Sequence, residues 1–111
     1  PHFRAASVLR PDWPQNLNGL AWILATHREA KARRPGEAVV LAHRAATLTG
    51  FRIPSVLDTL AAAHAESGQF EQAIRRAKEA VAKADEHHKP GIEARLRLYE
   101  SGRVYHQPAS R

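Results

Sequence analysis

Apolar residues recur along this chain with the spacing of amphipathic helices. In five segments they return every three or four residues, and no segment alternates residue by residue as a strand would. Proline precedes and glycine follows several of these segments, as Pro54 and Gly68 do for the third. The pattern predicts helices over about residues 13–26, 36–49, 54–68, 70–87 and 90–101. We therefore expect an all-α protein.

The predicted helices repeat in pairs. Leucines and alanines of the first helix recur 40 residues later in the third, and alanines of the second recur 35 residues later in the fourth. The pairs are Leu17 with Leu57, Leu20 with Leu60, Ala21 with Ala61, Ala25 with Ala65, Ala38 with Ala73, Ala42 with Ala77, and Ala45 with Ala80. The shift is 40 residues for one helix and 35 for the other. This difference implies a five-residue insertion in the first turn, around residues 27–36. Because small residues let antiparallel helices approach closely, we expect tandem helix hairpins.

The second pair of helices, residues 54–86, resembles a tetratricopeptide repeat (TPR). Its first helix has the family's spacing at Leu57, Leu60, Ala61 and His64, and its turn reads Gly68-Gln69-Phe70. Its second helix has Ala73, Ala77 and Ala80 at the family's positions, although His64 and Ala77 replace its usual aromatic residues. Residues 16–26 and 96–103 look like the last repeats and closing helix of a longer bacterial TPR protein.

This resemblance implies one TPR-like domain over residues 1–105, an α-solenoid built as a right-handed superhelix. Residues 1–12 would end a truncated repeat, residues 14–53 and 54–88 would form two repeats, and residues 90–102 would be a capping helix. In that helix Ile92, Leu96 and Tyr99 are expected to pack inward, with Arg95 in water. Residues 106–111 would be a tail, frayed from Gln107 onward.

The resemblance also implies a concave groove, lined by the first helix of each pair, that holds a peptide or partner segment. The groove positions are Gln15, Asn18, Trp22, Ala25, Thr26, Ser55, Asp58, Ala62, Ala65 and Glu66. We interpret Asn18 and Asp58 either as solvated surface or as groove contacts. Trp22 has two interpretations as well. It is either an anchor for an apolar residue of the partner or filler for a trough over Ala62 and Ala65.

Charge adds an alternative function. The net charge is +6, and four cations lie in one short stretch: Arg28, Lys31, Arg33 and Arg34. Such a loop could contact nucleic acid, but no aromatic residues interleave with it as a stacking platform would require. We therefore expect a protein-binding scaffold, with nucleic-acid contact through residues 28–34 as the alternative.

The residues indicate no catalytic or cofactor chemistry. The chain has no cysteine and seven scattered histidines; His87 and His88 are adjacent, so in a helix they diverge and suit no shared metal. There is no phosphate-binding glycine loop, and Ser55, Asp58 and His64 on one helix are not spaced as a catalytic relay. We expect no enzyme activity, no catalytic residue, no metal site and no cofactor.

The remaining expectations concern location and assembly. No apolar run is long enough to cross a bilayer, and the lack of cysteine leaves the cytoplasm and the periplasm both open. Solenoids need about three repeats to cover their apolar faces. Because this chain has two, we expect self-association at the N-terminal end, around Phe3, Val8, Trp13 and Leu17.

Overall fold

The computed structural model describes residues 13–108, and these residues form helices and turns with no strand. The elements are α2 (Pro14–Thr26), the short 3₁₀ helix η1 (Ala30–Ala32), α3 (Pro35–Leu48), α4 (Pro54–Glu66), α5 (Phe70–Lys83) and α6 (Lys89–Glu100). The predicted all-α class is confirmed. Proline occupies the first turn of α2, α3, α4 and α6, where its missing N–H costs no helical hydrogen bond.

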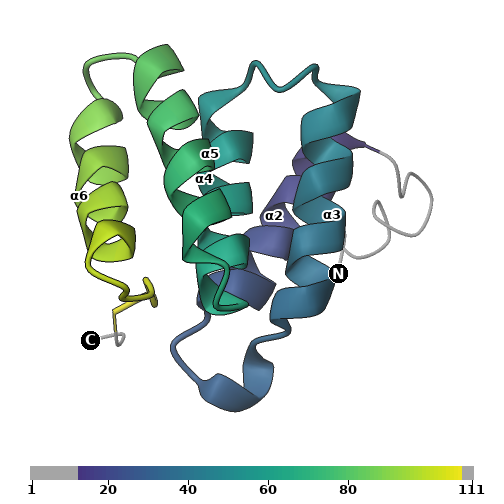
Figure 1. Cartoon of the computed structure of the whole chain (residues 1–111). Helices are drawn as coiled ribbons and strands as arrows, with labels where there is room; N and C mark the ends of the chain where they lie inside the picture. The colour runs from purple at the N-terminus through teal and green to yellow at the C-terminus, as the bar shows by residue number, and fades with distance from the viewer. Residues whose placement is uncertain (1–12, 109–111) are drawn as a thin grey trace.

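The α-helices pack in chain order and run in alternating directions (Figure 1). α2 packs on α3 and α4, α3 packs on α4, α4 packs on α5, and α5 packs on α6. α4 is the central element, and its side chains are buried without interruption from Val56 to Ala63. A helix buried on every side over this stretch is expected only where neighbours cover every side.

Alanine forms much of the core. The recurring alanines Ala21, Ala25, Ala38, Ala42, Ala45, Ala61, Ala65, Ala73, Ala77 and Ala80 are all buried. Leu17, Leu57 and Leu60 are buried with them. All of the repeated positions except Leu20 are therefore buried, as predicted.

Two leucines of the expected inner stripes are on the surface. Leu20 is 38% exposed in α2, and Leu48 is 51% exposed in α3. In α3 the buried position near the end is Ala46, which follows Ala42 by four residues and so extends the same stripe. Leu48 lies outside that narrow stripe. The apolar spacing of residues 36–49 predicts that Leu48 faces inward, and that prediction is wrong.

α5 ends at Lys83, four residues before the predicted end. Ala84 is extended, with ψ near 150°, and Asp85 begins the turn that leads into α6. The Asp85 carboxylate accepts a hydrogen bond from the His88 backbone N–H at 2.9 Å. Short acidic side chains offer the backbone such local alternatives to a continued helix, which explains the earlier end.

The capping helix α6 covers one end of the helical stack. Ile92 and Tyr99 are almost fully buried, and Leu96 is half-buried, as predicted. Ile92 contacts the cluster of Leu57 and Ala80. Arg95 does not stay in water as expected, because it turns back toward α4.

No helix within residues 13–108 is long and apolar enough to cross a membrane.

Candidate functional site

The ten predicted groove residues lie on α2 and α4 and differ widely in exposure. Gln15 and Ser55 are exposed; Asn18, Trp22 and Glu66 are half-buried; Ala25, Thr26, Asp58, Ala62 and Ala65 are buried. The alanines therefore form the floor of this surface. The polar and aromatic residues around them make the contacts described next.

Asp58 is the centre of a buried ion pair. Arg95 of α6 donates from Nε to Oδ1 at 3.0 Å and from Nη2 to Oδ2 at 2.8 Å. Such two-pronged pairs of arginine and carboxylate combine charge with fixed geometry. The interpretation of Asp58 as solvated surface is wrong, because its side chain is only 10% exposed. The pair joins α4 to α6 across the groove.

Burial and pairing act in opposite directions on these two groups. Burial raises the pKa of the Asp58 carboxyl, and the hydrogen bonds and charge of Arg95 offset only part of that rise. Burial disfavours the charged form of Arg95 too, but the Asp58 carboxylate outweighs it, so the pKa of Arg95 is raised. Both hydrogen bonds are donated by Arg95 to carboxylate oxygens, which is the geometry of an ion pair.

Trp22 lies between the alanine floor and the C-terminal segment. It packs against the cluster of Ala25, Ala38, Ala62 and Ala63. The Arg95 guanidinium lies 5.4 Å from its ring centroid, and the Tyr105 ring centre is 5.8 Å away. Arg95 also lies 5.2 Å from the Tyr105 ring, a distance typical of cation–π contact.

Glu66 joins the insertion between α2 and α3 to the C-terminal segment. Its Oε2 accepts a hydrogen bond from Arg33 Nε at 2.8 Å, and its Oε1 accepts one from His106 Nε2 at 2.7 Å. Arg33 also donates from Nη1 to the His27 carbonyl at 2.6 Å. The insertion is therefore attached to the end of the groove.

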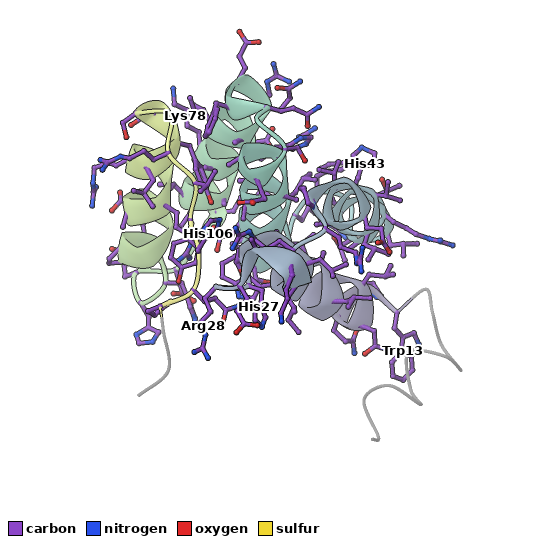
Figure 2. All side chains as sticks on the ribbon, turned by 90° about the horizontal axis from the view of Figure 1, so that it is seen from below. Trp13, His27, Arg28, His43, Lys78 and His106 are labelled. Atoms are coloured by element: carbon purple, nitrogen blue, oxygen red, sulfur yellow. The ribbon has the colours of Figure 1, made fainter. Side chains whose placement is uncertain are left out.

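Beyond α6 the chain runs over the predicted groove residues toward the end of α2 (Figure 2). The Gln107 backbone N–H donates to the Thr26 carbonyl at 2.8 Å, and its side-chain Nε2 donates to Thr26 Oγ1 at 3.0 Å. Figure 2 shows His106 on this path, between α6 and the region of His27 and Arg28. The prediction that fraying starts at Gln107 is therefore wrong. We call residues 103–107 the C-terminal strap.

Two hollows flank the ion pair of Asp58 and Arg95. One, of about 290 Å³, is lined by Asn18, Trp22, Ser55, Asp58 and Arg95 among others. The other, of about 350 Å³, lies toward α6, where His88 and Ile92 join Ser55, Asp58 and Arg95. Four of the ten predicted groove residues line these hollows: Asn18, Trp22, Ser55 and Asp58. The buried Oδ1 of Asn18 has no hydrogen-bond partner among the described residues.

Sequence reasoning missed five residues of this site: Arg33, Arg95, Tyr105, His106 and Gln107. The pair Val104-Tyr105 was a usable signal, because apolar residues after the closing glycine are unusual in a free tail. No comparable signal marked Arg95, which sits among other charged residues of α6.

The basic insertion is only partly available to an outside partner. Arg33 is 12% exposed and bound to Glu66, and Arg34 lies 3.9 Å from Glu37. Arg28 and Lys31 are exposed. Within residues 13–108 no cluster of histidine and acidic side chains has the arrangement of a metal site.

Comparison of the chain with protein-family models, with curated proteins and with solved structures found no match in any of the three.

Proposed function

We propose that this chain is a protein-interaction scaffold of the TPR type, from a longer bacterial protein, that binds an extended segment of another protein over α2 and α4. One observation carries the proposal. The chain's own strap already lies on this surface without regular secondary structure, through Tyr105 on Trp22, His106 on Glu66 and Gln107 on Thr26. A surface that accommodates one non-helical segment has the shape and the polar groups to accommodate another.

The polar groups suit a peptide backbone. A bound segment carries N–H and C=O groups that need partners when water is displaced. The Thr26 carbonyl and hydroxyl accept hydrogen bonds at one end of the groove. Toward the middle, the buried Oδ1 of Asn18 lines a hollow as an acceptor without a partner in residues 13–108.

The hollows beside the ion pair of Asp58 and Arg95 extend the surface beyond the strap. Their volumes, about 290 and 350 Å³, suit one or two side chains each. Their walls combine apolar side chains with an ion pair whose charges balance. That lining favours a segment with mixed apolar and polar side chains over a strongly charged one.

The order of the helices and the buried alanines support the TPR assignment, since each helix packs on its chain neighbours as in a stacked repeat. The acidic groups of the groove are engaged in ion pairs, which supports binding over catalysis. The alternative, nucleic-acid contact through residues 28–34, is weakened because Arg33 is held by Glu66. A steep fall of affinity with salt would identify that alternative.

A peptide-display selection on the full chain tests the proposal, with the selected peptides measured one by one. The blocking variant Ser55→Trp fills the entrance to both hollows from an exposed position. The matched control, Lys78→Trp, places the same bulk on an exposed site of α5 away from His27 and Arg28 (Figure 2). Selected peptides should lose at least about tenfold in affinity with Ser55→Trp and keep it with Lys78→Trp. Equal affinity for both variants would contradict the proposal.

A further inference from the structure

We propose that the C-terminal strap is an internal competitor, which a partner must displace, and that the partner's segment carries an aromatic residue followed directly by a residue with an N–H donor. This inference rests on the proposed function. Its first support is that the strap covers predicted binding residues, since it contacts Trp22, Thr26 and Glu66.

Residues 104–107 make none of the hydrogen bonds that close the C-terminal end of α6. The helix is closed by its own hydrogen bonds, from the Gly102 N–H to the Tyr99 carbonyl at 2.9 Å and from the Arg103 N–H to the Leu98 carbonyl at 2.8 Å. Gly102 has a φ of 73°, which glycine adopts without strain, so the chain can turn sharply there. Residues 104–107 can therefore detach while these two hydrogen bonds stay closed.

The strap is held by hydrogen bonds from two residues and by the packing of Val104 and Tyr105 against the buried cluster that contains Ala61, Ala65 and Tyr99. Residues 104–107 have no regular secondary structure, and all four are half-exposed. Two of them hydrogen-bond to the groove, His106 to Glu66 and Gln107 to Thr26. Because a tethered segment is present at high effective concentration, weak contacts suffice to keep it docked. An outside segment with more contacts can still replace it.

The contacts of the strap define the chemistry of its replacement. The Tyr105 ring lies 5.8 Å from Trp22 and 5.2 Å from the Arg95 guanidinium, which is a place for an aromatic side chain. The next residue reaches the Glu66 carboxylate, so an N–H donor such as histidine, lysine or arginine fits it. The partner segment would gain further contacts in the hollows beside Asp58, which the strap does not line.

The test uses a labelled peptide with the sequence of residues 103–108 and blocked ends. Its binding is measured by fluorescence anisotropy to the full chain and to the full chain with Tyr105→Ala and His106→Ala. Freeing the groove raises the competent fraction, so the apparent Kd should fall at least about tenfold in the double variant. The same peptide with alanine at the tyrosine position should bind more weakly. A chain ending at Arg103, which keeps the hydrogen bond that closes α6, serves as the second variant, with its helix content checked by circular dichroism.

Three outcomes would overturn the inference. The peptide could bind the folded double variant no more tightly than the full chain, and the chain ending at Arg103 could give the same result. Alternatively, both variants could lose their helix content, which would make the strap part of the fold.

The display-selected peptides separate this inference from the proposed function. If they bind the groove with equal affinity whether or not the strap is weakened, the scaffold proposal stands. The proposal that the strap competes with the partner is then rejected. If no peptide binds the groove even when the strap is weakened, the scaffold proposal itself fails.

Discussion

Trp22 has a structural contribution that its groove position alone did not reveal. Its indole packs on Ala25, Ala38, Ala62 and Ala63, so much of it fills the trough instead of awaiting a partner. We expect Trp22→Ala to lower the free energy of unfolding by about 2 kcal/mol, below the range for a fully buried tryptophan because the ring is only half-buried. Chemical denaturation measures this. An unchanged midpoint would favour the anchor interpretation.

Asp85 makes the stability of the chain depend on pH. The backbone N–H of His88, and then its imidazole, hold the pKa of the Asp85 carboxyl below its ordinary value of 3.8. A carboxyl with a lowered pKa in the folded state stabilises the fold above its unfolded pKa, and this contribution disappears as the pH falls through the lowered value.

Asp85→Asn isolates this charge, because the side-chain oxygen of asparagine can accept the same hydrogen bond from the His88 N–H. The variant should melt at a lower temperature than the parent at about pH 7, and the two should converge at about pH 2. Thermal unfolding followed by circular dichroism measures both. A difference of the same size at both values would show that the charge is not responsible.

At the residue scale, the sequence predicts which side chains are buried better than it predicts which side chains bind each other. The alanine floor follows from helical spacing, because a period of 3.6 residues assigns each position to a face. The partner of Asp58 does not follow from spacing. Arg95 comes from a helix 37 positions later in the chain, and only the packing of α6 brings the two together.

At the element scale, helix existence was predictable and helix ends less so. All five α-helices lie where apolar spacing and proline predicted them, with starts within about one residue. The end of α5 was missed because a local hydrogen bond at Asp85 competes with continuation of the helix. The strap was missed because it has no periodicity at all.

Removal of α6 should destabilise the chain severely. Cutting after Lys89 exposes the surface that Ile92, Leu96 and Tyr99 cover. The free energy of unfolding should fall by an amount on the order of 4–8 kcal/mol, because the burial of these three apolar side chains is lost. The cut also leaves Asp58 buried without Arg95. Because small domains are stable by about 5–15 kcal/mol, we expect the shortened chain to lose most or all of its cooperative unfolding transition. An unchanged melting temperature would show that α6 is not a cap.

At the scale of the whole molecule, the apolar surface is unevenly distributed. The large exposed hydrophobic residues among those described are Trp13, Leu20, Ile23, Val40, Leu48 and Ile53, all before α4. Leu17, expected to contribute to this surface, is buried. Phe3 and Val8 lie outside the described residues. The far end of the stack, by contrast, is covered by α6.

The sequence predicts self-association at the N-terminal end. The exposed apolar residues of α2 and α3 are where we expect a second copy of the chain to pack. We expect the average mass in sedimentation equilibrium to rise with concentration. Leu20→Ser with Ile23→Ser should lower that rise, whereas Lys78→Ser on α5 should not. A strict monomer at high concentration would count against it.

The hydrogen bonds between Thr26 and Gln107 connect positions 81 residues apart. In a linear array of helix pairs each unit touches only its neighbours, so the first and last units can open independently. Here the last described segment is hydrogen-bonded to the end of the first described helix, so the two ends of the folded region contact each other. Opening at either end then has to break the same contacts, which links the local unfolding of the two ends. Displacement of the strap would break the contact between Thr26 and Gln107. A segment that replaces the strap would therefore also determine whether the two ends of this folded region open together or separately.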